Sequence, residues 1–108
     1  MEAMAVPILP GKLDVWEAWT GELTGPRKAD FEDMNQRHGV TTHGAWLQQN
    51  PDGTSVAVVV IDGPGASGFM GKLATSDNEF DAGFRSKIEE VHGMNFSAPP
   101  PPAPIRRL

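Results

Sequence analysis

Three histidines carry the most versatile side chains in this chain. His38 and His92 each precede a glycine, in the segments RHGV at 37–40 and VHGM at 91–94. An imidazole titrates near neutral pH and serves as a base, an acid or a metal ligand. Each histidine is therefore a candidate for catalysis, metal binding or a purely structural role.

His43 is the first candidate for a catalytic or ligand-binding residue. It alternates with Ala45 and Leu47, so it lies on the otherwise apolar face of a predicted strand. A buried imidazole needs a hydrogen-bond partner, so His43 is either a satisfied core residue or a catalytic base. His38 lies five positions earlier, which is not the spacing of a helical metal-binding pair. We expect no metal site.

His92 is the second catalytic candidate, at the end of a predicted helix. A histidine at this position lies beside the last backbone carbonyls, where positive charge is favourable. The glycine that follows is the residue that most readily ends a helix in the left-handed conformation. His38 and Gly39 repeat the arrangement earlier in the chain. Both pairs are predicted to end helices, and catalysis by His92 is the alternative.

Three tryptophans could line a site for a flat aromatic ligand. Trp16 and Trp19 share the apolar stripe of a predicted helix, which favours a core position. Trp46 alternates with Gly44, whose missing side chain leaves room beside the indole ring. Either a ligand or a partner side chain can fill that room. Trp46 and His43 are therefore the candidate ligand-binding residues.

Charged and glycine-rich segments suggest no further site. Arg85 follows Asp81 by four positions, as expected for an exposed ion pair within one helix. The segment 63–68 is rich in glycine but lacks the lysine and the spacing of a phosphate-binding loop. It is predicted to be a turn before a helix. No motif indicates a cofactor, and we expect none.

The two halves of the chain share one pattern at an offset of 54 residues. In each half a Pro-Gly pair precedes a His-Gly pair by 28 positions. Apolar positions match apolar positions at this offset, as in the pairs Trp16–Met70, Trp19–Leu73, Met34–Ile88 and Val40–Met94. A constant spacing of this kind indicates an internal structural repeat.

The periodicity of apolar residues places the elements that position these side chains. Strands are predicted over 4–9, 41–48, 54–61 and 94–97, and helices over 12–23, 26–38, 64–73 and from the capping box Ser76–Glu79 to His92. The order βαββαβ predicts an α+β, ferredoxin-like fold, in which a four-stranded antiparallel sheet carries two kinked helices on one face. Residues 1–97 form this single domain. Residues 98–108 form a proline-rich tail.

The segment SVAVVVI at 55–61 is apolar on both faces of its predicted strand. Ala57, Val59 and Ile61 point to one side, and the three valines between them point to the other. Two helices cover only one face, and each uncovered valine forfeits about 1.5 kcal/mol. A second copy of the sheet is the simplest cover. The sequence therefore predicts a homodimer packed through its sheet faces.

The composition limits the partners and the compartment. A formal net charge of −5 argues against nucleic-acid binding, which needs a basic face. Glu2 and the missing positive region argue against a signal peptide, and no apolar stretch has membrane-spanning length. The chain contains no cysteine, which fits a cytoplasmic protein.

The element order, the length and the apolar outer face resemble the dimeric α/β-barrel superfamily. The segments PGK at 10–12, LQQNPDG at 47–53 and DNEFDAGFRSKIEEVHGM at 77–94 also resemble an uncharacterised family of small actinobacterial proteins. The superfamily includes cofactor-free monooxygenases, haem-degrading monooxygenases, muconolactone isomerase-like proteins and stress-responsive proteins. In its haem-degrading branch an Asn, a Trp and a His form the site; Trp46 and His92 are present here, but the first strand has no Asn. The resemblance implies a cavity between each sheet and its helices, or inside the barrel.

Three functions remain open from the sequence. The first is a dimer that binds a small hydrophobic or aromatic molecule, which extends to a cofactor-independent monooxygenase-like or isomerase-like enzyme. The second is a non-catalytic structural or stress-related dimer, because no acid-base set converges in the sequence. The third is a docking role for APPPPAPIRRL at 98–108, which suits a polyproline-reading module.

Overall fold

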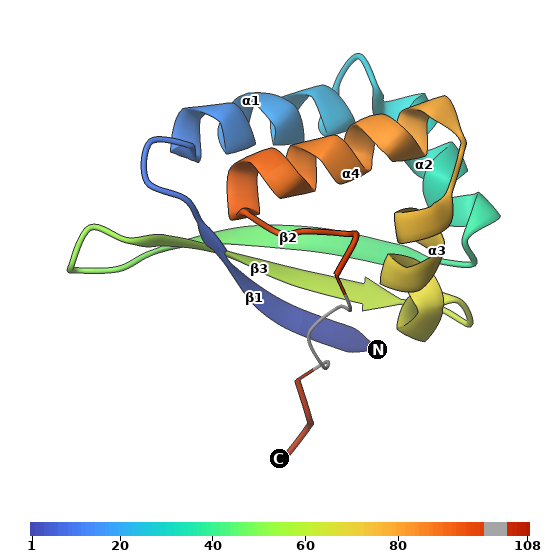
Figure 1. Ribbon diagram of the computed structural model, residues 1–108. Helices are drawn as coiled ribbons and strands as arrows, with labels where there is room; N and C mark the ends of the chain where they lie inside the picture. The colour runs from blue at the N-terminus through green and yellow to red at the C-terminus, as the bar shows by residue number, and fades with distance from the viewer. Residues whose placement is uncertain (99–103) are drawn as a thin grey trace.

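A computed structural model describes residues 1–98 and 104–108. The elements in chain order are β1 (Glu2–Ile8), α1 (Leu13–Thr24), α2 (Lys28–Arg37), β2 (Thr42–Gln49), β3 (Ser55–Asp62), a 3-10 turn η1 (Ala66–Gly68), α3 (Phe69–Thr75) and α4 (Glu79–His92). The strands form one antiparallel sheet in the order β1-β3-β2, and the helices lie over one of its faces (Figure 1). The mixed α+β architecture predicted from the sequence is confirmed.

The fourth predicted strand does not form within the described residues. Residues 94–97 pair with no strand and contain a turn. Asn95 explains the turn, because its Oδ1 accepts hydrogen bonds from the backbone N–H and the hydroxyl of Ser97 at 3.0 and 2.6 Å. The sheet of the described residues therefore has three strands, with β1 at one edge. The proline-rich tail prediction falls largely on residues 99–103, outside the described part; residues 104–108 have no regular structure.

The alternation predicted for β3 is confirmed. Ala57 and Ile61 are buried against the helices, at 0 % and 3 % exposure, and Val59 lies on the same face. Val56 and Val58 are on the opposite face and are half-buried. Because β3 is the central strand, its inward residues form the middle of the core floor.

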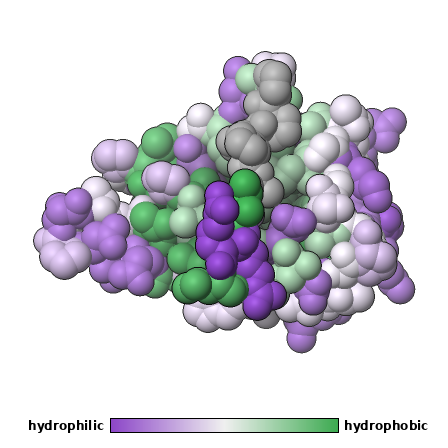
Figure 2. Space-filling view, turned by 90° about the horizontal axis from the view of Figure 1, so that it is seen from below, coloured by the Kyte–Doolittle hydropathy of each residue, from purple (hydrophilic) through white to green (hydrophobic). Residues whose placement is uncertain are grey.

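No helix of the described residues covers the outer face of the sheet, which we define as the side chains of Ala3, Ala5, Pro7, Thr42, Gly44, Trp46, Gln48, Val56, Val58, Val60 and Asp62. Seen from below, hydrophobic surface gathers on this side of the molecule (Figure 2). Trp46 is 58 % exposed there. Ile105 and Leu108 at the described end of the tail are not packed against it, since they remain 74 % and 104 % exposed.

The repeated His-Gly pairs end helices, as predicted. Gly39 follows α2 with φ of +71°, and Gly93 caps α4 with φ of +70°. This left-handed conformation costs least at glycine. The amide of Gly93 donates to the carbonyl of Glu89 at 2.9 Å, which closes the last turn of α4.

Two helix starts differ from the prediction. The Ser76–Glu79 capping box is absent, because Asn78 is the N-cap of α4 and its Oδ1 accepts from the amides of Phe80 and Asp81. The predicted helix 64–73 begins later, as η1 and then α3. Gly65 explains the delay, since a Cβ there would lie 1.8 Å from the His38 carbonyl oxygen. Its amide donates to the carbonyl of Gly39 at 2.9 Å, which holds the backbone against the end of α2, and the helical turns begin after it.

Candidate functional site

A cavity of about 230 Å³ lies between the sheet and the helices. Its floor is centred on one row of paired residues, in which Met4 of β1 and Ala45 of β2 flank Val59 of β3. Ala45 and Val59 are short side chains and Met4 is unbranched, so this row leaves space below the helices. The inward face of the sheet thus forms a shallow apolar floor.

Large side chains from four helices form the roof and walls. They share an apolar or aromatic character and are Trp16, Trp19, Leu23, Phe31, Phe69, Met70, Phe84 and Ile88. Trp16 and Trp19 are buried, at 7 % and 8 % exposure, and they also line the cavity. They are therefore both core residues and lining residues, which were the two alternatives for them. Within the described lining no Lys, Arg, Asp or Glu is present.

The cavity opens near the C-terminal end of α1. Thr24, the last residue of α1, and Ala45 on the edge strand β2 are the exposed members of the lining. The cavity therefore reaches the surface where these two residues lie.

His43 projects into the cavity from β2. Its Nδ1 lies 2.8 Å from Oδ1 of Asn35 on α2. Its ring is surrounded by Phe31, Phe69 and Phe84, with centroid distances of 4.9, 5.5 and 6.1 Å. Because an amide oxygen only accepts, Nδ1 carries the proton and donates it, and Nε2 keeps a lone pair.

Burial lowers the pKa of His43 from its ordinary value of 6.5 to about 4. Removal from water penalises the charged imidazolium, and no acidic side chain of the described lining offsets this penalty. His43 is therefore neutral at pH 7, with Nε2 as an acceptor.

His92 lines the same cavity from the end of α4. Its Nδ1 lies 2.8 Å from the carbonyl oxygen of Pro7. Burial lowers the pKa of His92 below its ordinary value, although this hydrogen bond opposes the shift. The two predicted catalytic candidates, His43 and His92, are thus brought to one cavity, and both are held through Nδ1.

Trp46 is separated from His43 by the sheet. The two residues are three positions apart, so their side chains point to opposite faces of β2. The room expected beside Gly44 is taken by the indole ring of Trp46 itself, because a Cβ at Gly44 would lie 3.1 Å from the ring. Trp46 belongs to the outer face and does not line the cavity.

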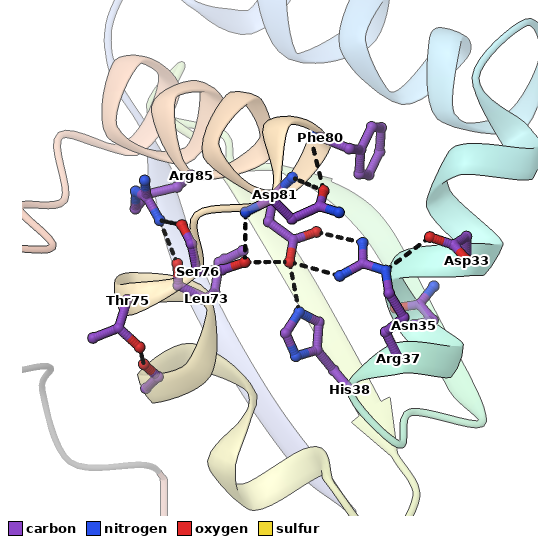
Figure 3. Close-up of polar contacts among 12 residues, drawn as sticks. Asp33, Asn35, Arg37, His38, Leu73, Thr75, Ser76, Phe80, Asp81 and Arg85 are labelled. Carbon is purple, nitrogen blue, oxygen red and sulfur yellow. Dashed lines mark hydrogen bonds and ion pairs between the residues drawn. The ribbon is translucent and has the colours of Figure 1, made fainter.

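His38 belongs to a buried polar network around Asp81 (Figure 3). The Asp81 carboxylate is 0 % exposed and lies 2.8 Å from Nε2 of His38. Arg37 donates to both carboxylate oxygens, at 2.8 and 3.0 Å, and the Ser76 hydroxyl donates at 2.7 Å. Ser76 contacts Asp81 and not His38, so the group does not have the order of a catalytic triad.

Burial would raise the pKa of Asp81, but the hydrogen bonds from Arg37, His38 and Ser76 outweigh it and hold the pKa well below its usual range. The predicted Asp81–Arg85 pair is therefore wrong. Arg85 instead donates to the carbonyls of Leu73 and Ser76, at 2.6 and 3.0 Å (Figure 3). The Asp81 carboxylate instead forms a bidentate ion pair with Arg37 of α2.

Across 1–98 and 104–108, no three His, Asp or Glu side chains converge as metal ligands. Over the same ranges, no helix combines the length and the apolar content needed to cross a bilayer.

Sequence reasoning missed the residues that define the surroundings of His43. Asn35 and the three phenylalanines come from three separate helices, and no local spacing connects them to a strand residue. The sequence indicated a buried role for Asp81 only in that it is a charged residue in an otherwise apolar helix stripe. Comparisons with protein-family models, curated proteins and solved structures found no match.

Replacing Asp81 tests the buried network. Asp81→Asn removes the charge that Arg37 and His38 face, and we expect the free energy of unfolding to fall by about 2–3 kcal/mol in urea titrations. Asp33→Asn is the matched control, because Asp33 binds the same Arg37 at the exposed surface, at 2.8 Å. An exposed pair contributes about 0–1 kcal/mol. Equal losses in the two variants would contradict a structural role for the buried carboxylate.

The low pKa of His43 predicts a pH-dependent stability. Between pH 6.5 and about 4 the unfolded chain binds a proton at His43 that the folded chain does not. The free energy of unfolding therefore decreases as pH falls through this window, by at most about 3 kcal/mol from His43. Urea titrations at several pH values measure this. His43→Phe should flatten the profile, with a remaining slope from His92; identical slopes in both proteins would refute it.

Proposed function

We propose that this protein binds a small, ring-containing apolar molecule in the cavity between its sheet and its helices. The observation that supports this most directly is the lining, which combines many aromatic and aliphatic side chains with a few polar ones and no charge. Its volume of about 230 Å³ exceeds the roughly 150 Å³ of an engineered cavity that binds benzene. A molecule of one or two rings matches this size.

Binding fits the chemistry of the cavity better than catalysis. A general base works best when its pKa is near the working pH. A pKa of about 4 makes His43 a weak base at pH 7, but a good neutral acceptor. An isomerase-like or cofactor-independent monooxygenase-like enzyme is the alternative, with His92 as its base, because His92 lines the cavity and its Nε2 is free to take a proton.

A purely structural role accounts less well for the cavity. Unfilled apolar volume destabilises a fold, because the lining loses contacts that packed atoms would make. A chain selected only for stability or assembly gains from larger side chains at positions such as Ala45. The opening beside Thr24 is likewise what a binding protein requires.

We further propose that two copies pack through their outer faces to form a dimeric α/β barrel. Three half-buried valines, Trp46 and the small side chains of β1 form this face, and its described charged side chain, Asp62, lies at the end of β3. An exposed apolar face of this kind marks an interaction site. The superfamily resemblance implies the same assembly.

The outer face is suited to contact its own copy. The β1 side of this face is low, with Ala3 and Ala5, and the β2 side carries the bulky indole of Trp46, which also covers Gly44. In a twofold interface each surface meets an identical surface. The ring of one copy can therefore pack on the low β1 side of the other, which makes a second copy the partner that we favour.

The ligand-binding proposal is tested by thermal shift with indole and 2-naphthol. Binding should raise the Tm with ligand concentration, by about 4–8 °C for each kcal/mol of stabilisation. Ala45→Phe places a ring in the mouth of the cavity and should abolish the shift. Ala18→Phe, on the exposed side of α1, is the control and should retain it. A shift that survives in Ala45→Phe would locate binding elsewhere, and no shift in the wild-type protein would reject the proposal.

The dimer proposal is tested by sedimentation equilibrium at micromolar concentration. We expect twice the chain mass of 11.6 kDa for the wild-type protein. Val58→Lys places a charge in the centre of the outer face, and should give folded monomers, because an unpaired charge at an interface core is unfavourable. Ala18→Lys is the control and should remain dimeric. A monomeric wild-type protein would disprove the assembly.

A further inference from the structure

The polar atoms of the cavity have a common property. Apart from backbone groups, they belong to four side chains of the lining, namely Thr20, Thr24, His43 and His92. In each of them the proton is engaged outside the cavity. These four side chains therefore offer a ligand only lone pairs, which accept hydrogen bonds.

The two imidazoles are fixed in one tautomer. The oxygens of Asn35 and Pro7, each 2.8 Å from an Nδ1 atom, only accept hydrogen bonds. Each Nδ1 therefore carries the proton, and each Nε2 is an acceptor as long as the ring is neutral. Within the described residues neither Nε2 has a partner, and no buried side-chain nitrogen or oxygen is unsatisfied, so both atoms face accessible space.

The two threonines behave in the same way. The hydroxyl of Thr20 donates to the carbonyl of Glu17 at 3.1 Å. The hydroxyl of Thr24 donates to the carbonyl of Thr20 at 3.0 Å. A threonine hydroxyl has a single proton, so its remaining lone pairs can only accept. All four polar side chains of the cavity therefore accept hydrogen bonds and donate none to it.

We infer that the ligand is an uncharged aromatic molecule that donates a hydrogen bond, a phenol or an aromatic N–H compound, to Nε2 of His43 or His92. This inference rests on the proposed function and narrows it to one chemical class. A carboxylate or phosphate would meet only lone pairs on these side chains and no cationic side chain of the described lining, so its charge would be buried unpaired. A pure hydrocarbon would leave the Nε2 acceptors without a partner.

The test compares three naphthalene derivatives of similar size. At pH 7, 2-naphthol carries a donor, 2-methylnaphthalene has a methyl group in its place, and 2-naphthoate is an anion. Their Kd values are measured by fluorescence titration or calorimetry. The quantity compared is the ratio of the Kd of 2-methylnaphthalene to that of 2-naphthol, in the wild-type protein and in variants, because this comparison cancels the different hydration of the two probes.

Two variants remove the acceptors and keep the aromatic lining. We expect the ratio to fall about three- to tenfold in His43→Phe or in His92→Phe, the factor of one hydrogen bond. Ala18→Phe is the control and should keep the wild-type ratio. A ratio unchanged in both histidine variants, or 2-naphthoate binding as tightly as 2-naphthol, would overturn the inference. Binding of both neutral probes with an unchanged ratio leaves the proposed function intact, whereas no binding of any probe rejects both.

A second measurement needs no variant. Nitrogen-15 NMR of the wild-type histidines follows each Nε2 directly. A donor at the Nε2 lone pair should shift its resonance when 2-naphthol is added, and 2-methylnaphthalene at the same occupancy should leave it in place. Equal effects of the two probes, or none from 2-naphthol at saturation, would contradict the inference even where the variants fail to fold.

Discussion

The buried carboxylate of Asp81 is the interaction on which the upper layer of this fold depends. It receives hydrogen bonds from the end of α2, through Arg37 and His38, and from Ser76 in the segment before α4. A buried charge of this kind is tolerated only when every oxygen is paired. The network therefore holds α2 against α4, and the stacked rings of Phe31 and Phe84, 6.1 Å apart, follow from that contact. Those two rings flank His43, so the geometry of the cavity depends on Asp81.

β3 imposes a second constraint on the fold, because this strand is apolar on both faces. One face packs against the helices and the other has no covering helix among the described residues, yet the helices do not fill the space above the row of Met4, Val59 and Ala45. Roof side chains such as Trp19 and Phe84 are large and meet each other edge to face, with centroids 5.0 Å apart. Aromatic pairs of this kind keep a preferred geometry. The cavity lies between these rings and the short side chains of Val59 and Ala45.

Local signals in the sequence were sufficient for the helix ends and for the faces of the central strand. Gly39 and Gly93 adopt the conformation that favours glycine, and the alternation along 55–61 survives in β3. Other predictions failed where a side chain made a contact that spacing does not encode. Asn95 replaced an expected strand with a turn, and Asn78 displaced Ser76 as the N-cap. These residues compete through hydrogen bonds to nearby backbone, and propensity does not rank such competitors.

The candidate site was predictable only in part, for a related reason. His43 and His92 could be selected by type and by apolar surroundings, but Asn35 and Pro7, which fix their tautomers, are 8 and 85 positions away. Asp81 was assigned to the neighbour four residues on, whereas its partner Arg37 is 44 positions away. Contacts between elements depend on the packing angles of helices, which periodicity does not supply.

Trp46 and His43 do not flank one site as predicted, because they are an odd number of positions apart on β2. Their separation by the sheet changes how the molecule can work. An odd spacing on a strand sends two side chains to opposite faces. The cavity and the proposed interface are therefore separated by the thickness of one sheet, and their side chains do not mix. They meet only along the strands, where Val58 of the outer face directly precedes Val59 of the cavity floor. A ligand that displaced β3 would alter the proposed interface without contacting it. A ligand that displaced only the rings of the roof would leave the interface unchanged.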